Sequence, residues 1–293
     1  MAKARIIYPA IVTVLVLATY WAGGLLYEKR AGFDGDRAYQ DVVYQVSLGP
    51  RWPGSEAHSK TVRWILLELN AAGWRTETQE ANLVDQQLRN LIAQRGTERP
   101  WIILGAHYDS RLWADLDPDP AKRKEPVPGA NDAASGVAVL LELARVLPKD
   151  LQKQVWLVFF DAEDQGNIQG QDWILGSRAF VEQLSVIPDK VVIVDMIGDS
   201  NLKIYFEDTS NQELARQIWD QAAKAGFEAQ FIKENKYQIL DDHIPFVQRG
   251  IDASVIIDFD YPYWHTTSDT PDKVSAHSLR AVGETLLQWL ENA

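Results

Sequence analysis

Five short apolar runs alternate with stretches of helical periodicity from residue 88 onward, and this alternation limits the possible folds more than any other feature. The runs have the length of strands and are rich in Ile, Val or Phe: 88–93, 101–106, 155–160, 191–194 and 253–257. Helical spacing of apolar residues covers 133–147, 177–184, 212–225 and 275–290. Strands covered on both faces read as continuous apolar runs, and their alternation with helices is typical of parallel sheets. We therefore expect an α/β fold, a three-layer αβα sandwich with helices on both faces of a mostly parallel, twisted central sheet.

The N-terminal segment differs from the rest of the chain because residues 6–27 carry no charged side chain. Lys3 and Arg5 precede this stretch, which has roughly the 20 residues that a helix needs to cross a bilayer. Aromatic residues stand where an interfacial belt would lie: Tyr20, Trp21 and Tyr27. A cleaved signal peptide is the alternative. We expect residues 1–30 to be a membrane anchor or signal segment, with a single N-terminal helix at the membrane and the following domain on the extracytoplasmic side.

Length, charge and cysteine content restrict what the remainder, residues 31–293, can be. Its length suits a single domain with a well-buried core. The formal net charge of the chain is −12, so its surface repels phosphate backbones, and we expect no nucleic-acid partner. The chain has no cysteine, which removes disulfides, thiolate nucleophiles and Cys-rich zinc sites. Any metal must be held by His, Asp and Glu, the ligand set expected of catalytic zinc.

Acids and histidines gather directly beyond the predicted strands. They occupy the segments 105–111, 161–166, 194–199 and 261–267, together with 128–136 at the start of a helix. Each carboxylate alone reads as a helix cap or a solvated loop residue. Together they converge on one edge of the sheet, where open α/β sheets bind their ligands. Carboxylates crowded at one edge repel each other unless a cation holds them, so the set predicts a metal site.

These motifs resemble, in the same order, those of the zinc aminopeptidases with a co-catalytic metal pair and of their relatives, the animal-type glutaminyl-peptide cyclotransferases. The resemblance extends from Tyr44 to the C-terminus. It implies five metal ligands: His107, Asp132, Asp164, Asp195 and His265. It also implies that Glu163 is the general acid/base, that one or two Zn²⁺ bind per chain, and that residues 31–293 form a single zinc-dependent catalytic domain. The family's usual Glu-Glu pair is Glu163-Asp164 here, and Asp164 is one methylene shorter.

Three features are similar to the cyclase branch of this family. Residues 107–111 read His-Tyr-Asp-Ser-Arg, residues 241–246 read Asp-Asp-His-Ile-Pro-Phe, and Trp264 directly precedes a predicted ligand. In cyclases one zinc polarises the γ-amide carbonyl of an N-terminal glutamine, and the residue matching Glu163 moves a proton to departing ammonia. The resemblance assigns the remaining roles as follows: Asp195 and Asp241 support catalysis through hydrogen bonds, and Trp264 and Tyr261 bind the substrate.

Two departures from the cyclase pattern leave the substrate open. A cyclase histidine aligns with Val255 here, and the indole expected soon after the Glu pair has no secure match, since Trp173 lies further along. The leading hypothesis is a glutaminyl cyclase acting on peptide and protein N-termini. The alternatives are a zinc aminopeptidase on the same scaffold, in which a metal-bound water attacks the first peptide bond, and a peptide-binding domain without activity.

Three further histidines receive structural interpretations. His58 lies on a predicted amphipathic helix and His277 at a helix start, so we expect both to be surface or capping residues. His243 lies beside the paired acids, and we expect it to support them rather than to bind metal.

Overall fold

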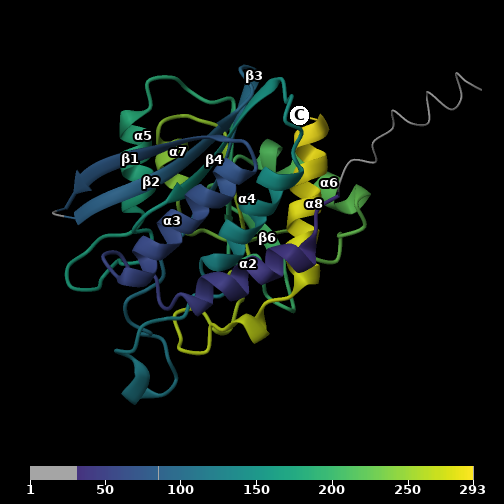
Figure 1. The fold of residues 1–293 in the computed structure, drawn as a ribbon. Coiled ribbons are helices and arrows are strands. Elements are labelled where there is room, and N and C mark those ends of the chain that lie inside the picture. Colours follow the sequence, from purple (N-terminus) through teal and green to yellow (C-terminus); the bar gives the residue numbers. More distant parts are fainter. Residues whose placement is uncertain (1–31, 85, 293) are drawn as a thin grey trace, which may run out of the picture. The chain divides into compact units, whose positions relative to one another are not determined.

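A computed structural model describes residues 32–84 and 86–292, and Phe33–Ala293 forms one compact unit (Figure 1). In the described part of the chain, no helix is both long and apolar enough to cross a bilayer. The prediction that a single helix anchors the protein at a membrane is therefore wrong for this part. The segment on which that prediction fell, residues 1–30, lies outside the described residues.

The central sheet has six strands in the order β1-β2-β4-β3-β5-β8. Their bounds are β1 Arg75–Leu83, β2 Gln86–Arg95, β3 Glu98–His107, β4 Lys153–Phe160, β5 Lys190–Asp195 and β8 Ala253–Ile257. The four strands β4, β3, β5 and β8 are parallel, whereas β2 pairs antiparallel with both β1 and β4. The predicted α/β fold is confirmed as a mixed sheet surrounded by helices.

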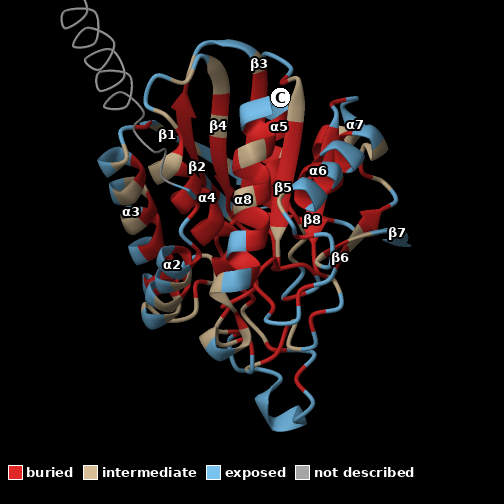
Figure 2. Cartoon of the chain, turned by 90° about the vertical axis from the view of Figure 1, so that its right-hand side faces the viewer, coloured by how far each residue is buried: buried red, intermediate tan, exposed pale blue. Residues whose placement is uncertain are grey.

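Alternate residues of each central strand enter two different apolar cores, because successive side chains of a strand point to opposite faces. On β3, Ile102 and Leu104 pack in one core and Ile103 in the other. The first face carries α2 Gly35–Ser47, α3 Glu56–Ala71, α4 Ala134–Val146, α6 Gln212–Lys224 and α8 Ala276–Asn292. The second carries α5 Leu175–Gln183 and the short α7 Ile244–Gln248. Figure 2 shows the resulting buried strands between exposed helix faces.

Helix α4 lies unusually close to the sheet, and Gly136 makes this approach possible. A Cβ at this position would lie 2.6 Å from the carbonyl oxygen of Val194 on β5 and 3.0 Å from the Cβ of Ala106 on β3. A side chain there would push α4 off the sheet. The predicted metal ligand Asp132 lies two residues before α4. The close packing of the helix on the sheet therefore also holds the loop that carries Asp132 in place.

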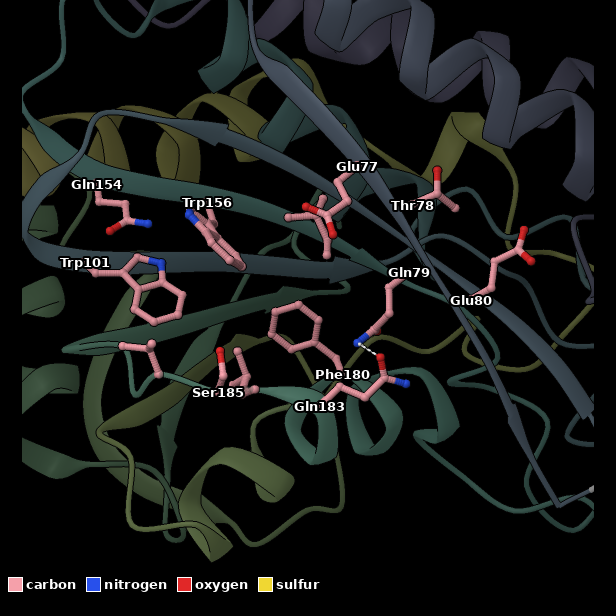
Figure 3. A pocket seen from close by; sticks show the side chains of 13 residues that line it. Glu77, Thr78, Gln79, Glu80, Trp101, Gln154, Trp156, Phe180, Gln183 and Ser185 are labelled. Atoms are coloured by element: carbon pink, nitrogen blue, oxygen red, sulfur yellow. Dashed lines mark hydrogen bonds between the residues drawn. The ribbon is translucent and has the colours of Figure 1, made fainter.

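A two-stranded parallel sheet, β6 Ile204–Glu207 with β7 Phe231–Tyr237, lies outside the central sheet. A separate hollow of about 590 Å³ lies over the second face, beside α5. Figure 3 shows its aromatic lining, which includes Trp101, Trp156 and Phe180. Trp101 and Trp156 are each the fourth residue of their strands, β3 and β4. The residues that line this hollow include none of the predicted site residues.

Candidate active site and metal centre

The carboxyl ends of the parallel strands bring the predicted site residues together. His107 ends β3 and Asp195 ends β5, while Glu163 and Asp164 follow β4 after a short turn. Asp132 lies two residues before α4, and His265 lies in the loop after β8. All five predicted ligands are at least nine-tenths buried except Asp195, which is partly exposed. The sheet edge therefore assembles the complete predicted set.

The ligand atoms form two groups that share Asp132. One group contains His107, Asp132 and Asp195, and the other contains Asp132, Asp164 and His265; within each group the ligand atoms lie within 4.8 Å of one another. Asp132 Oδ1 is 3.0 Å from His107 Nε2, whereas its Oδ2 is 3.8 Å from His265 Nε2. The two oxygens of one carboxylate thus face different groups, as a carboxylate bridging two cations must.

A divalent cation fits the donors of the Asp132–Asp164–His265 group. His265 Nε2 lies 2.9 Å from Asp164 Oδ1, while Asp164 Oδ2 is buried without a hydrogen-bond partner among the described residues. A buried carboxylate oxygen left unpaired is costly, and a metal ion would satisfy it. Imidazole nitrogen and carboxylate oxygen without sulfur form the usual donor set of catalytic zinc. The residues present therefore fit zinc.

Asp109 organises the loop that carries the catalytic pair. Its carboxylate accepts the main-chain N–H of Glu163 at 3.1 Å and of Asp164 at 3.3 Å, and the side-chain amide of Gln165 at 3.1 Å. His107 Nδ1 lies 3.4 Å from the same carboxylate. Burial opposes the charge of Asp109, but these hydrogen bonds prevail and lower its pKa. One carboxylate thus orients a predicted metal ligand and the turn after β4.

Asp269 plays the corresponding part for Asp132. Its carboxylate accepts the main-chain N–H groups of Asn131 at 2.8 Å and of Asp132 at 3.1 Å, and the hydroxyl of Tyr261 at 2.7 Å. Tyr261 is 3% exposed. We predicted that Tyr261 binds substrate, but its hydroxyl is committed to Asp269, so the structure places it behind the site as a support.

Burial and mutual repulsion shift the protonation of the remaining acids. Burial raises the pKa of Glu163 well above its usual value, and the carboxylates of Asp164, Asp242 and Asp241 add to the effect. Burial, helped by the charge of Asp195, raises the pKa of Asp241 to about 7. Glu163 and Asp241 therefore hold protons more readily than free carboxylic acids, as groups that transfer protons near neutral pH must.

A pocket of about 300 Å³ opens above these acids. Its acidic part contains Asp132, Glu163, Asp164, Asp195 and Asp241. Its apolar walls contain Trp173, Trp264, Ile239, Leu240 and Phe259. No lysine or arginine lines it among the described residues. A negative floor beneath apolar walls suits a compact ligand that carries a positive charge.

Trp173 is a wall residue that the sequence did not securely identify. Its ring stacks on that of His265, with centroids 6.0 Å apart and planes 8° apart. Trp264, predicted to bind substrate, contacts the same imidazole with centroids 3.9 Å apart and lines the pocket. The spacing in the sequence did not identify Trp173, because a loop separates it from Asp164. This loop places the indole back over the site.

The structure also locates the other residues singled out in the sequence. His58, predicted as a surface or capping residue, is instead buried, and its Nε2 lies 2.8 Å from Asp161. His243 lies 2.8 Å from the hydroxyl of Thr209 and 3.2 Å from Glu207, away from both ligand groups. Val255 is buried in the core of the second face and is not part of the pocket lining.

Comparison with known proteins identifies the family. The model for "Peptidase family M28" matches residues 90–290. The chain belongs to peptidase family M28. The glutaminyl cyclase of Tannerella forsythia superposes on it with a TM-score of 0.84 at 33% identity, covering 90% of this chain and 100% of that structure. A leucine aminopeptidase precursor from Bacteroides thetaiotaomicron gives 0.85 at 34% identity, covering 90% of this chain and 99% of that one.

A curated relative, the aminopeptidase YwaD of Bacillus subtilis, is 28% identical over 289 residues. The match covers 88% of this chain but only 58% of that relative. Together, these M28 relatives confirm the prediction of an enzyme from the aminopeptidase and glutaminyl cyclase family. A Zn-dependent exopeptidase from Parabacteroides distasonis superposes with a TM-score of 0.85 at 31% identity, covering 90% of this chain and 100% of that structure. This relative and the M28 family imply zinc as the metal, whereas the number of ions per chain stays a prediction.

Proposed function

We propose that this M28 enzyme is a zinc-dependent glutaminyl-peptide cyclotransferase, which converts the N-terminal glutamine of a peptide or protein to pyroglutamate and releases ammonia. Residues 31–293 would form its single catalytic domain. Asp132, Asp164 and His265 would hold the zinc ion on which the reaction depends. When bound there, zinc supplies Lewis acidity to the γ-amide carbonyl of the glutamine.

The acids of the pocket floor would carry the proton transfers. In the reaction, the α-amine forms a bond to the γ-carbonyl carbon, and the bond from that carbon to the amide nitrogen breaks. Glu163 would take a proton from the α-amine and deliver it to the departing nitrogen, which leaves as ammonia. Its raised pKa suits both halves of this transfer. Asp195 and Asp241 would orient the amine from the same side of the pocket, since both line it.

The contact of two indoles with the ring of His265 carries the proposal. Trp173 and Trp264 both lie against the imidazole of a predicted zinc ligand. Two flat aromatic residues beside that ligand line the pocket and would limit the access of water to it. A cyclase needs such a wall, because its nucleophile is the substrate's own amine and the glutamine must fold back on itself.

The second candidate function is aminopeptidase activity, and the second ligand group favours it. His107, Asp132 and Asp195 form a site beside the first, and a pair of metal ions activates water in two-metal hydrolases. The same acidic floor would bind a free α-amine in either reaction. The distinction therefore depends on whether water or the substrate's amine reaches the carbonyl carbon.

Mass spectrometry of products separates the two functions. Purified enzyme loaded with zinc is incubated with two peptides that differ only in their first residue, glutamine or leucine. Cyclase activity removes the mass of one ammonia from the glutamine peptide and leaves the leucine peptide intact. Removal of a whole N-terminal residue from either peptide would assign the enzyme to the aminopeptidases instead.

A further inference from the structure

Arg111 is a buried cation that none of the roles above uses. Its side chain is 2% exposed, and it is the last residue of the His-Tyr-Asp-Ser-Arg motif that begins at His107. The guanidinium forms a bidentate pair with the carboxylate of Asp115, at 2.7 and 2.8 Å. Its other donors reach the loop after β4, where they contact Asp164 and the carbonyl oxygen of Gly166. A guanidinium that divides its hydrogen bonds between Asp115 and the loop after β4 holds these two segments in a fixed arrangement.

The contact with Asp164 brings Arg111 to the metal centre. Nη1 donates to the main-chain oxygen of Asp164 at 3.0 Å and lies 3.3 Å from its Oδ1. This is the oxygen that also faces His265, while Oδ2 has no hydrogen-bond partner in the part of the chain that the structure describes. The guanidinium thus restricts the rotation of the carboxylate and leaves its second oxygen free. Asp164 is shorter than the glutamate usual in the family. Fewer of its side-chain conformations would therefore bring its carboxylate to the metal.

Arg111 also holds one wall of the pocket. Its guanidinium carbon lies 4.8 Å from the centre of the Trp173 ring, and such cation–π contacts are attractive when buried. Trp173 in turn packs directly on Gly166, where an added Cβ would lie 2.0 Å from the indole. The same arginine therefore contacts a metal ligand, a wall residue and the glycine beneath that wall.

We propose that Arg111 is a positioning residue that couples metal binding to the shape of the substrate pocket, by fixing Asp164 and Trp173 in one arrangement. Asp115 completes this cluster, because it orients the guanidinium and its Oδ1 lies 3.7 Å from His265 Nδ1. The proposal rests on the zinc ligands assigned under the proposed function, but it holds for either reaction. It predicts that zinc affinity and substrate binding change together when Arg111 is altered.

A purely electrostatic role would have the opposite effect on metal affinity. A cation beside Asp164 repels Zn²⁺, so removing its charge alone would strengthen zinc binding. A positioning role requires the planar, forked set of N–H donors of the guanidinium, which the ammonium group of lysine cannot reproduce. The variants Arg111→Met and Arg111→Lys therefore separate the two roles. Partners of metal ligands typically contribute about tenfold to a hundredfold to metal affinity, and we expect both variants to lose that much.

The experiment measures the zinc dissociation constant by competition with a chromophoric chelator, without any substrate. The visible spectrum of the Co²⁺-substituted enzyme reports the ligand geometry independently, and we expect both Arg111 variants to change it. Arg145→Met is the matched control, since Arg145 forms a partly buried pair with Asp41 at 2.5 and 3.2 Å, and its other ion pairs among the described residues are with Glu68 and Glu142. This control should cost stability and leave both zinc affinity and the Co²⁺ spectrum unchanged.

Gly166→Ala tests the same coupling between metal site and pocket by a change in the pocket wall. It pushes the Trp173 indole away without removing any charge, and we expect it to raise KM for the peptide and to alter the Co²⁺ spectrum. The proposal is overturned if Arg111→Met binds zinc as tightly as the parent or more tightly, or if Arg111→Lys matches the parent in both readouts. Asp132→Ala tests the assignment of the zinc ligands independently of Arg111. If that variant retains all its zinc, the proposed ligand set itself is wrong.

Discussion

The indole of Trp173 lies parallel to the imidazole of His265, with ring planes 8° apart. A second indole, from Trp264, meets the same imidazole at 35°. The walls of the pocket therefore restrict the orientation of a predicted zinc ligand. Substitutions in those walls should change the turnover of substrate before they change metal content.

Trp264→Ala should reduce the cyclisation of N-terminal glutamine and leave zinc bound. Loss of an aromatic contact of this kind costs about 1 kcal/mol, which corresponds to roughly a fivefold drop in kcat/KM, and loss of the pocket shape adds to it. Kinetic assays on a glutamine peptide and elemental analysis of the same preparation measure the two effects. A variant with unchanged kcat/KM would show that this indole does not face the substrate.

Replacement of the shared carboxylate should have the largest effect on metal content. Asp132 belongs to both ligand groups, so Asp132→Ala should remove all bound zinc, whereas His107→Ala should spare the Asp132–Asp164–His265 group. Elemental analysis of the parent should give between one and two zinc equivalents per chain, a range that follows from the two ligand groups. If His107→Ala also empties the protein, the ranking of the two groups is reversed.

Glu163→Gln removes a titrating group while preserving its size. General acid/base groups typically contribute about 10²–10⁴-fold to rate, so turnover should fall at least a hundredfold while the fold and zinc content stay as in the parent. Near-normal turnover of the variant would move the proton-transfer role to Asp195 or Asp241.

Glu207 supports the segment that leads to Asp241. We expect its substitution to lower the stability of the protein in a pH-dependent manner. Burial opposes its charge, but hydrogen bonds from His243 and from Thr209 prevail and lower its pKa to about 2. The charged form is therefore favoured by the fold, and its contribution is present above about pH 4.5 and is lost as pH falls toward 2. Glu207→Gln should lower the free energy of unfolding by about 3 kcal/mol at neutral pH, the value that this pKa shift corresponds to.

Chemical denaturation at several pH values measures this effect. The difference between the parent and Glu207→Gln should shrink steadily below pH 4.5, which is the unshifted pKa of the side chain. Glu213→Gln is a suitable control, because Glu213 lies exposed at the start of α6. A difference that stays constant from pH 7 to acid would show that packing, rather than charge, explains the role of Glu207.

The central strands could be predicted because burial on both faces makes them continuously apolar. The edge strand β1 could not, since none of its residues is buried and its sequence, Arg-Thr-Glu-Thr-Gln-Glu-Ala-Asn-Leu, has no apolar run. The helix α2 was also missed. It buries only a few positions, including Ala38 and Val42, and its apolar spacing is correspondingly sparse.

The acidic residues of the site could be predicted because parallel strands deliver their carboxyl ends to one edge. Residues whose role depends on a long loop or on packing could not. Trp173 reaches the pocket through a loop whose path the sequence does not specify. His58 follows the helical pattern of a surface residue, yet its ring stacks on Tyr108 and reaches Asp161 at the end of β4. Only tertiary packing distinguishes such a residue from a solvated one.

The close approach of α4 to the sheet at Gly136 has a consequence for how this scaffold can evolve. Three of the predicted metal ligands, His107, Asp132 and Asp195, lie on strand ends or on the loop before α4, where the packing leaves little freedom. The pocket walls come largely from separate loops, such as residues 238–240 and the segment that carries Trp173. Insertions in those loops would reshape the pocket without moving the metal, so a hydrolase and a cyclase could diverge from a common ancestor through changes in loops alone.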